Sequence, residues 1–170
     1  MTKSAKIFQQ LDECPIQAHL VNSLQLLDIV DHVIAQIGPS RLRMTSFSIS
    51  EEALRHLAMA KRNGSVTEVQ LALDFKATNK TVSLWYFIEA VCDRADLCEN
   101  HSKIVLLESA SGRRVAIMTS QNLTRGNRNE SYIIAEDPRI FDRLSADLDD
   151  IINNKSISLY DLLCRTAEDD

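Results

Sequence analysis

Glycine and proline are scarce in this chain, at 4 and 3 of its 170 residues. Disordered or loop-rich chains are typically richer in both. Apolar residues make up 45% and charged residues 25% of the sequence, which are the proportions of an ordinary globular protein. A chain of this length can bury most of its apolar surface around one core. We therefore expect residues 1–170 to form a single domain.

Metal-site, membrane and export signals are also lacking. The four cysteines form no CxxC pair, and no group of Cys and His has zinc-like spacing, so we expect buried free thiols and no bound metal. No apolar run approaches the length of a membrane span, and the first 15 residues have no apolar stretch of signal-peptide length. These absences predict a cytoplasmic protein that does not act at a membrane.

A basic excess is lacking as well, since the net charge is −5. Residues 1–143 are neutral, and residues 144–170 carry seven acidic but only two basic side chains. The acidity therefore belongs to the C-terminal part, which includes an expected acidic helical segment at 153–170. The neutral remainder is compatible with a polyanionic substrate, but it lacks the strong basic signature of a dedicated nucleic-acid binder.

Apolar periodicity in the first half alternates between helix and strand spacing. Leu27, Val30 and Ile34 fall on one helical face, which ends before Gly38-Pro39, and Asn22 or Ser23 is the expected cap. The second helix is expected to start with a capping box formed by residues 48 and 51. Together these patterns predict helix, strand, helix, strand and helix over residues 23–37, 41–48, 50–62, 66–75 and 80–95, with position 85 in the core.

The second half contains three strongly apolar strands. Residues 103–107 (KIVLL) and 115–118 (VAIM) flank a turn around Gly112, which predicts a hairpin, and residues 132–135 (YIIA) predict one more strand. Asp137-Pro138 opens a long helix to about residue 152, and residues 158–165 are expected to form a short extra helix. The fold class that follows is α/β, with a mixed central sheet flanked by helices on both faces.

The chemistry-bearing stretch is His101-Ser102-Lys103, at the start of a buried strand. Alternation along a strand places His101 and Lys103 on the same face. An imidazole beside an ammonium suits a phosphate, because one can attack or donate a proton and the other neutralises an oxygen. By itself an H-x-K sequence also fits a histidine and a lysine on a strand edge.

The order of motifs that follows narrows this reading. HSKIVLLE ends at Glu108, TSQN covers Thr119 to Asn122, and Glu130 comes eight residues later. This series resembles the signature of the phospholipase D superfamily, which is H-x-K-x4-D, then G-S-x-N, then an acidic residue. The resemblance, together with the order of elements, spans residues 20–152. Glu108 stands where the family usually has Asp, and Thr119 where it usually has Gly.

The resemblance implies a role for each matching position. His101 would attack phosphorus to form a phosphohistidine, and Lys103 and Asn122 would hold the phosphate oxygens. Glu130 would orient the imidazole, as the acidic member of other catalytic triads does. Ser120 and Thr119 would bind near the phosphate, and the acidic residue at position 108 would be a structural partner. The implied chemistry needs no cofactor and no metal.

The family logic requires two such motifs in each active site, whereas this chain has one. None of His19, His32 and His56 has a lysine two residues later, and we expect all three to be surface or half-buried helix residues. The resemblance therefore implies a symmetric homodimer that brings two copies of His101 together.

The expected substrate is a nucleic acid, because the small single-motif members of the family with known activities are largely nucleases. Arg125 and Arg128, in the loop before Glu130, are expected to guide a polyanion, although solvated loop charges are the plainer reading. Two alternatives stay open. One is a phosphodiesterase acting on phospholipid head groups, and the other is a non-catalytic nucleic-acid-binding module that retains the phosphate pocket.

Overall fold

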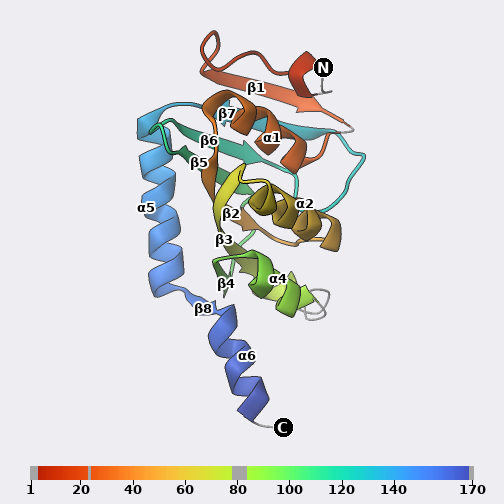
Figure 1. Ribbon diagram of the computed structural model, residues 1–170, viewed down its shortest axis with the longest axis vertical. Helices are drawn as coiled ribbons and strands as arrows, with labels where there is room; N and C mark the ends of the chain where they lie inside the picture. Colours follow the sequence, from red (N-terminus) through yellow and green to blue (C-terminus); the bar gives the residue numbers. More distant parts are fainter. Residues whose placement is uncertain (1–3, 23, 78–83, 169–170) are drawn as a thin grey trace.

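A computed structural model describes residues 4–22, 24–77 and 84–168. Its strands are β1 (Ile16–Val21), β2 (Ser40–Ser46), β3 (Val66–Asp74), β4 (Arg94–Cys98), β5 (Ile104–Ser109), β6 (Arg114–Thr119), β7 (Glu130–Ala135) and β8 (Ser156–Ser158). They form one eight-stranded sheet in the order β1-β7-β6-β5-β2-β3-β4-β8 (Figure 1). β2, β3 and β4 are parallel neighbours, and the other pairs are antiparallel. The sheet is therefore mixed, and β5 and β6 form the predicted hairpin.

Helices cover both faces of this sheet. They are α1 (Leu26–Ile37), α2 (Glu51–Arg62), α4 (Trp85–Val91), α5 (Pro138–Asn154) and α6 (Leu159–Glu168), with 3-10 turns at Ser4–Lys6 and Phe75–Ala77. Buried side chains of α1, α2 and α4 belong to the larger apolar cluster, and those of α5 belong to a smaller one. Alternate residues of β5 and β6 are divided between the two clusters, so α5 lies on the opposite face from α1 and α2 (Figure 1). The predicted fold class is confirmed.

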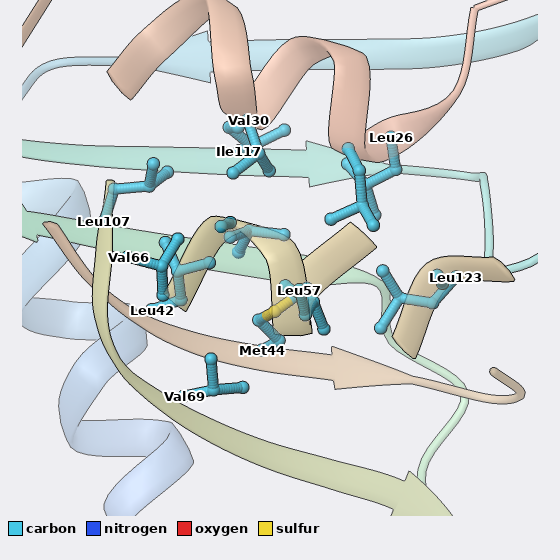
Figure 2. Close-up of a cluster of buried hydrophobic side chains, with 14 of the residues drawn as sticks. Leu26, Val30, Leu42, Met44, Leu57, Val66, Val69, Leu107, Ile117 and Leu123 are labelled. Atoms are coloured by element: carbon cyan, nitrogen blue, oxygen red, sulfur yellow. The ribbon is translucent and has the colours of Figure 1, made fainter. Parts of the chain in front are cut away.

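The larger core lies between the sheet and the first two helices. Figure 2 shows Leu42 and Met44 of β2 beside Leu57 of α2, and each of these side chains is no more than 1% exposed. Leu26 and Leu123 lie together at one end of the same cluster (Figure 2). Burial of each such side chain stabilises the fold by about 1.5–3 kcal/mol. This core thus fixes the two helices against the central strands.

The helix starts differ from those predicted. Gln25 precedes α1, and its backbone N–H donates to Asp28 Oδ2 at 3.0 Å, so the predicted cap at Asn22 is wrong, and residue 23 lies outside the described residues. Ser50 caps α2 by accepting from Ala53 N at 3.2 Å, so the predicted box at residues 48 and 51 is also wrong. Neighbouring polar residues compete for a cap, and only the docked helix decides which residue has the required extended backbone.

Three strands, β1, β4 and β8, were not predicted, and β8 interrupts the helical segment expected at 153–170. The third helix ends at Val91 because β4 begins at Arg94, and residues 80–83 of that prediction lie outside the described part of the chain. β1 reverses the usual pattern: Ile16 and Leu20 are 50% and 74% exposed, whereas Gln17 is buried. Apolar alternation alone therefore gives no signal for β1 as an edge strand.

A buried arginine fastens α5 to the sheet. Arg43 of β2 donates from Nε to Gln70 Oε1 and from Nη1 to Ser145 Oγ, both at 2.6 Å, and its guanidinium pairs with Asp149. Its side chain is only 9% exposed, and three partners satisfy its donors. The C-terminal acidic part thus supplies a structural ion pair. Among the described residues, no helix is long and apolar enough to cross a membrane.

Candidate active site

Three chain segments meet where the neighbouring strands β5, β6 and β7 start or end, on one side of the sheet. Because β5 pairs antiparallel with β6, and β6 with β7, the start of β5, the end of β6 and the start of β7 lie side by side. Thr119 N donates to Lys103 O at 3.0 Å, and Ser120 N donates to Ser131 O at 3.2 Å. This pairing gathers the matching motif residues, which we term the strand-end cluster: His101, Lys103, Ser120, Asn122 and Glu130.

His101 and Lys103 contact each other directly. Lys103 Nζ lies 3.1 Å from His101 Nδ1 and donates to His101 O at 2.6 Å. β5 begins at Ile104, so both residues occupy the connection before the strand, although they share one side as predicted. The imidazole is exposed, whereas Lys103 is 8% exposed. Burial lowers the pKa of Lys103, and attraction to Glu130 partly opposes that effect.

Side chains from β2 and β3 hold this connection in place. Thr45 Oγ1 lies 2.8 Å from Ser102 Oγ and accepts from Ile104 N at 3.1 Å. Asn100 Oδ1 accepts from Ser102 N at 3.1 Å, and Asn100 N donates to Asp74 Oδ2 at 2.8 Å. Ser102 therefore anchors the segment, while the residues on either side of it carry the reactive groups. No motif in the sequence indicates these supporting residues.

Glu130, the acidic member of the strand-end cluster, lies beside Ser120. Ser120 Oγ donates to Glu130 Oε2, and Ser131 N donates to Ser120 Oγ at 3.1 Å. Among the described residues, no hydrogen bond joins Glu130 to His101 of the same chain. The predicted role of Glu130 in orienting the imidazole is thus not performed by a contact within the chain.

Asn122 holds its side-chain oxygen against the end of β2 and the residue that follows it. Its Oδ1 accepts from Phe47 N at 3.3 Å and lies 3.5 Å from Ser46 Oγ. With the oxygen engaged in this way, the two N–H groups of Nδ2 are oriented to donate to an anion. The Phe47 ring lies 5.2 Å from the His101 ring at 54°. Phe47 is a site residue that no motif indicated, and its only sequence signal is its place directly after β2.

A buried hydrogen-bonded pair, Tyr132 and Gln121, supports the loop that carries Asn122. Tyr132 is 1% exposed and donates from its hydroxyl to Gln121 Oε1 at 2.6 Å. Gln121, which is 3% exposed, donates from Nε2 to Leu24 O at 3.1 Å. Burial raises the pKa of Tyr132, so its hydroxyl keeps the proton that it donates.

Tyr132→Phe is expected to lower the free energy of unfolding by about 1–2 kcal/mol, because the buried Gln121 oxygen loses its donor. If the site turns over a phosphodiester as the resemblance implies, the same change should lower that activity severalfold, since Asn122 directly follows Gln121. Chemical denaturation and steady-state kinetics measure the two effects. Tyr160→Phe is the matched control, because Tyr160 is 60% exposed on α6. Equal effects of the two substitutions would contradict a supporting role for Tyr132.

The remaining predicted residues lie outside the cluster. Glu108 sits toward the far end of β5 and pairs with Arg41 and Arg114 at 2.9 and 2.8 Å, which is an arrangement suited to a structural partner. Thr119 contributes its backbone and accepts from Gln121 N at 3.0 Å. Arg125 is exposed and lies 3.7 Å from Glu52. Arg128 is exposed in the same loop.

Two predictions for the other histidines need correction. His19 lies on β1 and not on a helix, and it is half-buried. His32 is on α1 as expected but is 7% exposed, because its ring packs against Phe8. Burial lowers the pKa of His32. His56 is half-buried on α2, as predicted.

The predicted burial of position 85 and of the cysteines holds only in part. Trp85 is half-buried and packs against the larger core. Cys92 and Cys98 are buried, and burial raises the pKa of their thiols to about 12 and about 11, respectively. Cys14 is half-buried and Cys164 is exposed, so the prediction of buried thiols is wrong for Cys164. Across residues 4–22, 24–77 and 84–168, no three His, Cys, Asp or Glu side chains group as metal ligands would.

Comparison with known proteins adds evidence from structure. By sequence, the chain matches no protein-family model and no curated protein. By structure, it is similar to Nuc from Salmonella typhimurium, a phospholipase D family member, with a TM-score of 0.64 at 16% identity over 84% of this chain and 96% of Nuc. The chain has the phospholipase D fold.

A second neighbour with this phospholipase D fold is a longer protein. Phosphatidylserine synthase from Haemophilus influenzae matches with a TM-score of 0.59 at 14% identity, over 84% of this chain but only 40% of the synthase. The family resemblance predicted from the motifs is therefore confirmed at the level of the fold.

Proposed function

We propose that this chain is a phosphodiesterase of the phospholipase D superfamily that hydrolyses nucleic acid. The main support for the proposal is that the residues of the strand-end cluster lie close together in a chain with the phospholipase D fold. Catalysis of phosphoryl transfer depends mainly on positioning and on charge stabilisation. His101 supplies the nucleophile or acid, Lys103 neutralises charge on the phosphate oxygens, and the Asn122 amide donates hydrogen bonds to them. The proposal places the protein in the cytoplasm, as the sequence predicts.

One chain presents one imidazole, so we place the reaction at the interface of a homodimer. Nε2 of one His101 attacks phosphorus and forms an N–P bond, while the P–O bond to the leaving group breaks. The opposing His101, in its charged form, donates a proton to the leaving oxygen. Water then transfers a proton to that imidazole and attacks the phosphohistidine, which releases the phosphate and the first imidazole.

The contact between Lys103 and His101 supports unequal roles for the two rings. A charged ammonium has only donors, so at 3.1 Å it makes Nδ1 the acceptor and leaves the proton of the neutral ring on Nε2. That ring already holds a proton on Nε2, and it becomes the charged acid when Nδ1 takes up a second proton in place of the contact with Lys103. The nucleophilic ring needs an Nε2 without a proton. Its proton must then be on Nδ1, where a carboxylate can accept it in a hydrogen bond. We assign this role to Glu130, reaching the ring across the dimer interface.

A cleavage assay in EDTA tests the proposal. Wild-type protein is expected to cleave single-stranded DNA or RNA without added divalent metal, because the proposed groups are all side chains. Absence of cleavage of DNA and RNA, single- or double-stranded, would reject the nuclease. Release of head groups from phospholipid vesicles in its place would favour the lipid alternative. Tight binding without turnover, unchanged by His101→Ala, would favour the non-catalytic module.

A further inference from the structure

One face of the sheet is partly uncovered beside the strand-end cluster. Four apolar side chains, paired in register, form a row across β5, β6, β7 and β1, which we term the apolar row: Ile104, Met118, Ile133 and Ala18. Residues paired directly across neighbouring strands point to the same face. Ile104 and Met118 are half-buried, whereas Ile133 is 41% exposed and Ala18 is exposed. The row therefore becomes more open toward the β1 edge of the sheet.

Helix α5 covers the next row of the same face. That row contains Leu106, Ala116 and Ala135, which are paired in register and are at most 1% exposed. Leu106 and Ala116 pack with Phe141 and Leu148 of α5 in the smaller apolar cluster. Alternate residues of a strand share a face, so the covered row and the apolar row belong to one surface. The cover over this surface is thus lost toward the strand-end cluster and toward β1.

The apolar row runs alongside the strand-end cluster. Ile104 directly follows Lys103, and Met118 lies two residues before Ser120. On β7, the row is three residues from the acidic member of the cluster. Leu20, which is 74% exposed at the same end of β1, extends the patch by one more side chain. A partner that covers this patch is therefore held next to the proposed catalytic groups.

The chemistry of the patch suits a second copy of the chain. Adjoining exposed apolar side chains mark contacts between proteins, whereas single ones do not. The apolar row and Leu20 carry no charge, so the patch can face its own copy across a two-fold axis without repulsion between like charges. The strand-end cluster holds one imidazole for each chain, and the proposed reaction uses two. A second copy docked on this face supplies the missing imidazole, which an unrelated protein does not.

We propose that the apolar row and Leu20 form the surface through which two copies of this chain meet. The inference rests on the proposed function and names the contact that holds the partner at its site. The patch supplies an apolar centre, and the neighbouring strand-end cluster supplies part of a polar rim, which is the usual build of a protein interface. Ile16 and Leu20 point outward on β1 for this reason, in a strand whose inward side carries the buried Gln17.

Subunit association tests the surface without reference to catalysis. Leu20→Glu and Ile133→Glu each place two carboxylates in the contact, one from each copy, and should raise the Kd of the dimer at least about a hundredfold. Met59→Glu and Ile157→Glu are the matched controls and should leave it unchanged, because these side chains are 58% and 46% exposed on α2 and β8. Sedimentation velocity over a concentration series measures the Kd, and circular dichroism checks that each variant is folded.

Two further measurements separate lost association from lost folding. Leu20→Ser removes the apolar side chain without adding a charge and should weaken the dimer about tenfold. Activity per chain of Leu20→Glu should rise with protein concentration, because mass action restores the dimer. An unfolded variant shows no such rise. Activity of the Met59 and Ile157 variants should not depend on concentration where wild type is fully dimeric.

The outcomes distinguish the surface from the chemistry. A wild-type chain that is monomeric at every concentration overturns the proposal, and so does a dimer that neither Leu20→Glu nor Ile133→Glu weakens. Vesicle binding by a monomeric wild type, abolished in Leu20→Glu, would assign the patch to a membrane instead and also overturn it. A dimer that depends on Leu20 but cleaves no phosphodiester rejects the proposed function and upholds the surface. Cleavage by a dimer that both variants leave intact rejects the surface alone.

Discussion

Mixed dimers of wild-type and His101→Ala chains are expected to be inactive, so activity should fall faster than the fraction of wild-type chain. If each active site needs an imidazole from both subunits, a freely exchanged equal mixture keeps only about a quarter of the activity. If each subunit has its own complete site, the same mixture keeps about half. The His101→Ala dimer itself should lose at least about a thousandfold in kcat, because it lacks both nucleophile and acid.

The measurement is a titration of activity against mixing ratio after the subunits have been exchanged. His19→Asn is the control, since it removes an imidazole on β1, outside the strand-end cluster, and its mixtures should keep full activity. A strictly linear decline in the His101→Ala titration would contradict the shared site. A monomer seen by light scattering at the assay concentration, together with full activity, would contradict it as well.

Lys103→Met is expected to lower kcat about a hundredfold to a thousandfold, because one charge that stabilises the transition state is lost. The same substitution should not lower the midpoint of thermal unfolding. Burial disfavours the charged amine, so its removal costs the fold little. A loss of activity at unchanged stability therefore separates catalysis from folding. Lys155→Met, at the exposed end of α5, is the matched control and should change neither quantity.

The pH dependence of the activity provides a second test of the role proposed for Lys103. Because burial lowers the pKa of Lys103, its charged form is lost at a lower pH than that of an ordinary lysine. Activity should accordingly decline on the alkaline side as Lys103 loses its proton. In Lys103→Arg the side chain stays charged, so this alkaline decline should move upward or disappear. An alkaline limb that is identical in both proteins would exclude Lys103 as its source.

Local patterns in the sequence were sufficient for the central sheet and for the positions of the motifs. The continuous apolar run before Glu108 requires a strand covered on both faces, and Gly112, at φ 83°, closes the hairpin that follows. These two features already place Lys103 near Asn122. Contacts between distant segments were not predictable in this way. Phe47 reaches the site only because β2 lies next to β5, which is a matter of sheet order.

The failure to predict β1 has a similar cause. β1 was not recognised because its apolar residues point outward, while Gln17 turns inward to the loop between the 3-10 turn and β1, where it donates to Gln9 O and Cys14 O. A pattern of burial can be inferred from sequence only where the apolar side is the covered side. The helix caps at Gln25 and Ser50 depend likewise on contacts made by the loop near Gly126 and Leu123, which lie far away in sequence.

The hydrogen bond that Gln25 Nε2 donates to Gly126 O, at 3.0 Å, also bears on how the protein folds. These residues are 101 positions apart, and β7 must enter the sheet between β1 and β6. Contacts of such long range close late, because chain entropy must be lost before they form. During refolding, helical signal should therefore return before the strand-end cluster is assembled. A chain still emerging from the ribosome would complete the proposed active site only after nearly all of the sheet had been synthesised.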